Sequence, residues 1–198
     1  PTVSANTLAA TLQARYDTIR DFSADFVQTY RGGILRTQTS EAGTVIVKKP
    51  GMMRWHYTTP ETKEFVSDGE RAYFYVPQDR QVLVNDLPPD DQLGTPALFL
   101  AGKGNITEDY DADYAEPPGG GTTELRLTPR AGDPEYEYLV LTIDATNLQI
   151  RALAVLDLQG GESTIVFSNL QENQGLTDTS FVFRIPRNVD VVTNGSFD

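Results

Sequence analysis

The sequence predicts a mainly β protein of the α+β class, built on one large antiparallel sheet that curves toward an incompletely closed barrel. Three observations predict this fold. Apolar and polar residues alternate in about 11 short segments, turn-forming residues separate these segments at intervals of about 8–12 residues, and helical patterns are few. Nothing marks a domain boundary, so we expect residues 1–198 to form a single domain.

The first element is expected to be a helix over residues 5–20. Leu8, Leu12, Tyr16 and Ile19 recur at the spacing that places side chains on one face of a helix. This apolar stripe predicts that the helix packs against the sheet.

The repeat changes to two residues after Asp21, where Phe22, Ala24 and Phe26 alternate with polar positions. Asp68-Gly69 is a strong signal for a hairpin turn between two later segments. The expected strands cover residues 22–30, 44–48, 52–57, 64–67, 71–76, 81–84, 123–128, 136–143, 150–156, 163–168 and 181–183. We expect the chain after Pro186 to be irregular.

A short helix is expected to interrupt the strands at residues 96–101. Thr95 is a good N-terminal cap, Pro96 suits the first helical position, and Gly102 suits the C-terminal cap. Because the residues between them are apolar on every side, the helix must be buried or must cover an apolar surface.

Composition excludes several classes of function. The net charge of −12 argues against binding to nucleic acid and to anionic lipid surfaces. The absence of cysteine excludes disulfides, thiolate catalysis and cysteine-ligated metals. His56 is the only histidine, so no site can use two imidazoles.

The chemically suggestive segments have simpler interpretations. Residues 119–121 are three glycines with no Lys-Ser/Thr after them, so they predict a flexible hairpin rather than a phosphate loop. Residues 108–113 are acidic but lack the glycine and glutamate of a calcium loop, which favours an acidic strand or loop. We therefore expect no enzymatic activity, metal or cofactor.

A group of apolar residues would share the inward faces of neighbouring strands if the strands follow one another in a simple meander. They are Phe22, Phe26, Val45, Val47, Met53, Trp55, Tyr57 and Phe65. The pattern alone leaves two alternatives open, an ordinary packed core and a cavity for an apolar ligand.

Several segments resemble the periplasmic outer-membrane lipoprotein carrier family, the LolA-like proteins. The segments are LQARYDTI (12–19), DFSADFVQ (21–28), GTVIVKKPGMMRWHY (43–57), VSDG (66–69), YFYVP (73–77), QV (81–82) and TPALFL (95–100). Their order and spacing make the resemblance specific; it is strong from residue 12 to 102 and weaker beyond.

The resemblance implies an unclosed antiparallel β-barrel whose mouth is covered by helices. It implies a non-enzymatic periplasmic carrier that takes acylated lipoproteins from an inner-membrane ABC transporter to the outer membrane, commonly to a receptor lipoprotein. We expect the protein to be a monomer. The eight apolar residues would then line a lipid cavity. Since exposing an acyl chain to water costs about 0.8 kcal/mol per CH₂, such a cargo needs an apolar enclosure.

The resemblance also implies a lid and a latch. The short helix would be the lid, beginning at Pro96 and filling the empty cavity with Leu98, Phe99 and Leu100. In this family an arginine before the strand-ending proline often bonds to the lid, and here that position is Lys49. Because an ammonium lacks the rigid donor fork of a guanidinium, we expect a looser latch.

Three alternatives stay open at this point. The same fold could serve a periplasmic regulator that senses lipid or envelope stress, although such proteins usually have a further domain. It could also serve the outer-membrane receptor, although the chain has no cysteine to be acylated. A carboxylate-based hydrolase is a distant fourth hypothesis.

Overall fold

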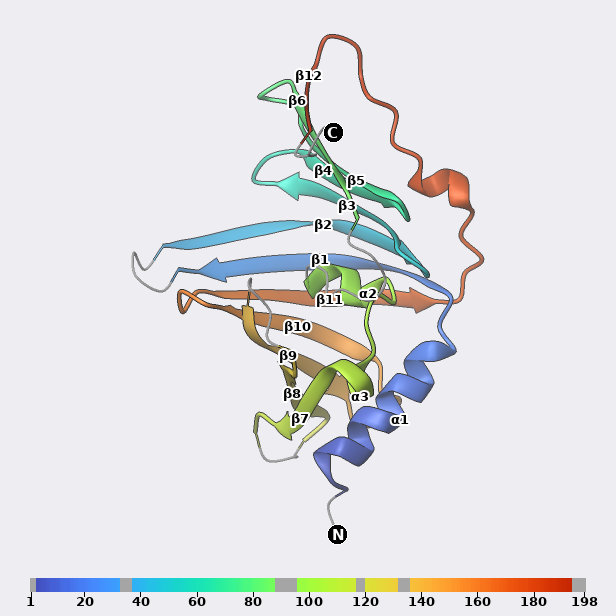
Figure 1. Ribbon diagram of the computed structural model, residues 1–198, viewed down its shortest axis with the longest axis vertical. Helices are drawn as coiled ribbons and strands as arrows, with labels where there is room; N and C mark the ends of the chain where they lie inside the picture. Colours follow the sequence, from blue (N-terminus) through green and yellow to red (C-terminus); the bar gives the residue numbers. More distant parts are fainter. Residues whose placement is uncertain (1–2, 33–36, 88–95, 117–119, 132–135, 194–198) are drawn as a thin grey trace. The chain divides into compact units, whose positions relative to one another are not determined.

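The computed structural model describes residues 3–32, 37–87, 96–116, 120–131 and 136–193 (Figure 1). Twelve strands form one sheet in the order β12-β6-β5-β4-β3-β2-β1-β11-β10-β9-β8-β7. Their bounds are β1 Asp21–Arg31, β2 Gln38–Lys48, β3 Met52–Thr59, β4 Lys63–Asp68, β5 Arg71–Val76, β6 Gln81–Asp86, β7 Tyr110–Tyr114, β8 Thr122–Pro129, β9 Tyr136–Asp144, β10 Ile150–Asp157, β11 Glu162–Glu172 and β12 Asp190–Thr193. The order has two ends, so the expected unclosed sheet is confirmed.

Three helices and one 3-10 helix accompany the sheet within the described residues. They are α1 Ala5–Asp17, α2 Pro96–Leu100, α3 Ile106–Asp109 and η1 Asp178–Phe181. The N-terminal helix is three residues shorter than expected, because Thr18 caps it by donating its backbone N–H to the carbonyls of Arg15 and Tyr16. The expected short helix is confirmed as α2, while its expected cap Thr95 lies outside the described residues.

Two strand expectations need correction. Residues 181–183 do not form a strand: Phe181 ends η1 and is fully buried, and the chain then continues without regular structure. The last strand is instead β12, which pairs with β6 in parallel, so the sheet is not wholly antiparallel. The alternating Phe-Val-Phe pattern at residues 181–183 therefore belongs to an irregular segment that packs an aromatic side chain into the core.

The acidic segment contains a strand that the alternation supports. In β7, Tyr110 and Ala112 are buried while Asp111 and Asp113 are exposed. This alternation is the two-residue period of a half-buried strand. Of the two predicted possibilities, an acidic strand or an acidic loop, the strand is confirmed over Tyr110–Tyr114.

The chain divides into two compact units, which we describe separately. The first comprises Pro1–Ile19, Phe26–Ser40 and Gly104–Ser168. Its core joins α1 to β7–β10, and its fully buried side chains include Leu12, Ile106, Leu125, Leu127, Leu139, Leu141, Ile143 and Leu153. The backbone N–H of Ile106 donates to Gln13 Oε1 at 2.8 Å, which ties α3 to α1.

The second unit comprises Arg20–Asp25, Glu41–Lys103 and Asn169–Asp198. Its strands β2–β6 follow one another as antiparallel neighbours. The Asp68-Gly69 turn joins β4 to β5 as expected. Asp68 Oδ1 accepts the backbone N–H groups of Glu70 and Arg71 at 2.9 and 2.8 Å, and Gly69 has φ +98°.

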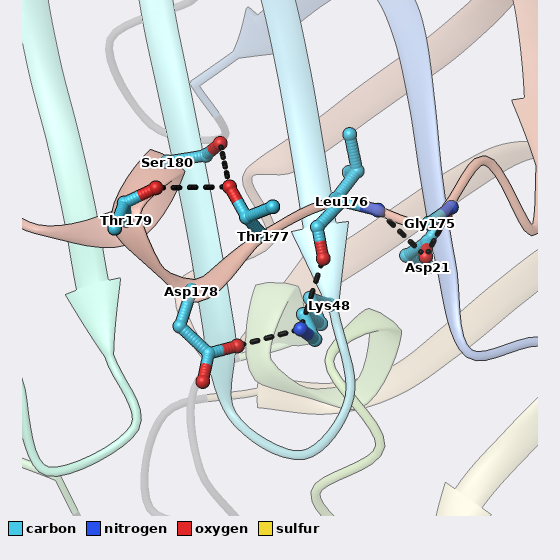
Figure 2. A network of polar contacts seen from close by, with 8 residues as sticks. All are labelled: Asp21, Lys48, Gly175, Leu176, Thr177, Asp178, Thr179 and Ser180. Carbon is cyan, nitrogen blue, oxygen red and sulfur yellow. Dashed lines mark hydrogen bonds and ion pairs between the residues drawn. The ribbon is translucent and has the colours of Figure 1, made fainter.

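The second unit also contains a long irregular segment, residues 173–189, which we call the C-terminal strap. It leaves the end of β11 and reaches β12, which pairs with β6 (Figure 1). Asp21 holds its beginning: the buried carboxylate accepts the backbone N–H groups of Gln174, Gly175 and Leu176 at 2.6, 3.0 and 3.1 Å. Figure 2 shows the last two of these bonds.

Lys48 and Arg54 hold the strap further along. The ammonium of Lys48 donates to the carbonyl of Leu176 at 2.9 Å and pairs with Asp178 at 2.6 Å (Figure 2). Arg54 Nη2 donates to the carbonyl of Val182 at 2.8 Å. Charge-assisted bonds from three strands thus attach the strap to β1, β2 and β3.

Replacing the carboxylate of Asp21 should loosen the strap. We expect Asp21→Ala to lower the free energy of unfolding by about 3 kcal/mol, because three backbone N–H groups lose a charged acceptor. Asp25→Ala is the matched control on the same strand, since Asp25 is exposed and accepts a bond from the side-chain amide of Asn169. Denaturant titration measures both variants, and equal small losses would contradict this role of Asp21.

Candidate functional site

A row of large apolar side chains crosses β2–β6 on one face of the sheet. Val45 lies opposite Trp55, Trp55 opposite Phe65, Phe65 opposite Phe74, and Phe74 opposite Leu83. Side chains of directly opposed residues share one face and touch, so these five residues form a continuous strip, the aromatic row. Val45 and Trp55 are buried, while the other three are half-buried.

A second row on the same face adjoins the first. It comprises Val47, Met53, Ser67, Ala72 and Asn85. Val47 and Met53 are fully buried, and the sulfur of Met53 lies 3.2 Å from Trp55 Nε1. Ser67 donates its hydroxyl to the carbonyl of Gly51 at 2.5 Å, which joins this row to the β2–β3 turn.

Polar groups border the aromatic row on its other side. Lys63 pairs with Glu41 at 2.5 Å, and its ammonium lies 4.6 Å from the centre of the Tyr57 ring. Burial raises the pKa of Tyr57 to about 12, and the negative charge of Glu41 acts in the same direction. The phenol therefore keeps its proton, and this side of the face ends in a neutral ring beside a half-buried ion pair.

The backbones of β2 and β3 lie very close together at Gly43, next to Tyr57. Gly43 lies opposite Tyr57, and a Cβ at Gly43 would lie only 1.9 Å from the carbonyl oxygen of His56. No other residue fits there without moving the backbone of β3.

The side chains at the C-terminal end of the short helix α2 are buried. Phe99, Leu100 and the following Ala101 are 4%, 1% and 0% exposed. The carbonyl of Ala101 accepts the backbone N–H of Gly51 at 2.8 Å, which attaches the end of the helix to the β2–β3 turn. The side chains of Pro96 and Leu98 lie outside what the structure describes.

Lys49 lies against the end of α2. A Cβ at Gly102 would be 2.8 Å from Cδ of Lys49, so the lysine stem packs on the glycine that follows the helix, where φ is +79°. The backbone N–H of Lys49 donates to the carbonyl of Arg20 at 2.9 Å. The lysine predicted as a latch is thus next to the predicted lid.

The structure brings most of the predicted cavity residues together. Six of them share the face just described: Val45, Val47, Met53, Trp55, Tyr57 and Phe65. Phe22 is buried in the same unit, whereas Phe26 is buried in the first unit. Phe74 and Leu83 also lie on this face but were not among the predicted cavity residues, although the alternation within the expected strands 71–76 and 81–84 places them there.

Two further observations concern other classes of site. Among the residues that the structure describes, no group of three or more His, Asp or Glu side chains is arranged to hold a metal ion. None of the helices in the described ranges is both long and apolar enough to cross a membrane.

The unclosed sheet is a known fold. An uncharacterized conserved protein from Thermus thermophilus shares it with a TM-score of 0.57 at 15% identity, over 94% of this chain and 99% of that one. The family follows from sequence: the chain belongs to the outer membrane lipoprotein carrier protein LolA family, whose model matches residues 17–184.

Curated relatives agree with this assignment. The outer-membrane lipoprotein carrier protein of Chromohalobacter salexigens is 33% identical over 94% of this chain and 87% of its own length. That of Hahella chejuensis is 30% identical over 88% of this chain and 82% of its own.

Titration of Tyr57 should cost stability at alkaline pH. Because its pKa is about 12 in the folded protein and 10 in the unfolded chain, only the unfolded state releases the proton between these values. The contribution of Tyr57 to the free energy of unfolding is intact below pH 10 and falls by about 1.4 kcal/mol by pH 11. Denaturant titrations of wild type and Tyr57→Phe should diverge by this amount, and parallel pH profiles would contradict the burial.

Proposed function

We propose that the protein is a periplasmic carrier that shields the acyl chains of lipoproteins and moves them from the inner to the outer membrane. The aromatic row carries this proposal. Its residues form an unbroken apolar strip across β2–β6, and Phe65, Phe74 and Leu83 are only half-buried. Membership of the carrier family supports acyl chains as the ligand.

The strip has the chemistry that an acyl chain requires. Each CH₂ group removed from water contributes about 0.8 kcal/mol, so a chain laid along apolar side chains gains affinity in proportion to its length. No catalytic group is needed for this task, and we propose carriage without catalysis.

The helix α2 acts as a lid in this proposal. Phe99 and Leu100 are buried, so in this proposal an arriving acyl chain competes with them for apolar contact. Loading and release are then a balance between two apolar occupants, and a partner shifts this balance only by favouring one state. An inner-membrane ABC transporter would load the carrier and an outer-membrane receptor would unload it.

Lys49 acts as a latch on the lid. Its stem packs against Gly102, and the neighbouring Gly51 bonds to the carbonyl of Ala101. These contacts hold the C-terminal end of the helix, where Phe99 and Leu100 are also buried. Because burial of apolar side chains is non-directional, such a lid can yield to a more apolar competitor.

Trp55 reports on occupancy, since it is the only tryptophan and lies within the aromatic row. We expect its emission to shift when a triacylated lipopeptide is added and to stay unchanged with the same peptide lacking acyl chains. Fluorescence titration checks this, and equal responses to both peptides would contradict an acyl site.

The same titration can locate the site. Leu83→Asn changes the aromatic row, whereas Val84→Asn changes the adjacent, also half-buried residue on the opposite face of β6. We expect the first variant to weaken lipopeptide binding at least tenfold and the second to leave it near wild type. Equal losses would place the ligand elsewhere.

Changing the latch should alter cycling without unfolding the protein. We expect Lys49→Leu to keep the wild-type unfolding midpoint but to slow delivery of lipoprotein to outer-membrane vesicles. Lys49→Arg, which keeps a cation and adds donors, should deliver at least as well as wild type. Unchanged delivery by Lys49→Leu would remove this residue from the mechanism.

A further inference from the structure

A cavity lies on the face opposite to the aromatic row. Its volume is about 470 Å³, within the range of pockets that hold ligands or side chains of partners. The floor comes from β3–β5 and the remaining wall from η1 and the strap. The lining residues are Arg54, Glu64, Tyr75, Thr179, Val182, Phe183, Arg184 and Pro186.

The cavity carries excess positive charge. Arg54 Nη1 pairs with Glu64 at 2.9 Å, so these two charges offset each other. Arg184 is exposed and has no ion-pair partner in the part of the chain that the structure describes. In a protein of net charge −12, this leaves Arg184 as an uncompensated cation beside a cavity of mixed polar and apolar lining.

The strap next to the cavity also offers unused backbone groups. Phe183, Arg184 and Ile185 lie outside every helix, strand and hydrogen-bonded turn of the described residues, and their backbone groups bond to no other backbone group there. The flanking side chains of Val182 and Ile185 are 52% and 45% exposed. An exposed, irregular segment with free N–H and C=O groups is suited to pairing with another polypeptide.

Aromatic packing attaches this part of the strap to the sheet. The ring of Phe183 lies 5.3 Å from that of Tyr73 and 5.9 Å from that of Tyr75, both on the sheet. Arg54 also holds the carbonyl of Val182 at 2.8 Å. The segment is thus fixed on one side and open on the other.

We propose that residues 182–186 and the cavity beneath them dock an acidic peptide segment of a partner protein. A carboxylate of the partner pairs with Arg184, an adjacent apolar side chain enters the cavity, and its main chain bonds to the strap. The site is independent of the aromatic row. Charge complementarity selects a single acidic segment over an anionic membrane, because an extended membrane surface is repelled by the whole chain.

The test uses blocked pentapeptides in which Asp alternates with Phe, Leu, Trp or Tyr, and a matched set with Lys in place of Asp. Fluorescence anisotropy measures their binding to the full chain. We expect the Asp set to bind and the Lys set to bind at least tenfold more weakly.

Arg184→Glu and Arg187→Glu form a matched pair of variants. Both arginines are exposed on the strap, but only Arg184 lines the cavity. We expect Arg184→Glu to weaken binding of the Asp peptides about tenfold or more and Arg187→Glu to change it less than about threefold, with unfolding midpoints unchanged.

Three results would overturn the proposal. The first is a lack of binding by every Asp peptide, and the second is an equal loss in both variants, which would indicate general charge attraction. The third is binding of wild type to phosphatidylglycerol vesicles through Arg184 in place of the peptides, which would assign the surface to a membrane.

Discussion

Apolar side chains lie on both faces of β3–β5, and the two segments that accompany this part of the chain, the strap and the short helix α2, are held by different kinds of contact. On one face the strap is fixed by charged groups: Asp21, Lys48 and Arg54 all bond to it. The short helix α2 is held at its C-terminal end by the backbone bond between Gly51 and Ala101, and Phe99 and Leu100 are buried. The contacts of the strap are suited to permanent attachment, and the apolar burial of the helix is suited to the exchange that the proposed function requires.

In the proposed function, this contrast would let the sheet stay stable while the short helix is exchanged for cargo. Bonds to a buried carboxylate have strict geometry and are costly to break. Apolar contact is non-directional, so one apolar occupant can replace another at little net cost. The proposed carrier function therefore depends on the apolar burial of the lid, to which Lys49 adds packing against Gly102 at the C-terminal end.

Local patterns predicted the apolar face and the short helix, but long-range contacts decided the rest. The two-residue repeat placed Trp55 and Phe65 on one side, and Pro96 and Gly102 marked the ends of the short helix. The strap could not be predicted, because Asp21 meets residues more than 150 positions away. For the same reason, the alternation at residues 181–183 predicted a strand there, whereas the strand lies at Asp190–Thr193, where β6 supplies a partner. A four-residue strand has too little pattern of its own to be recognised.

Native mass spectrometry of the protein isolated from the periplasm of a lipoprotein-producing bacterium would show whether an acylated passenger is bound. We expect a complex with intact acylated lipoprotein, and loss of that complex when the acylated cysteine of the cargo is replaced. Recovery of the protein with equal amounts of acylated and unacylated cargo, or with no lipidated passenger at all, would contradict it.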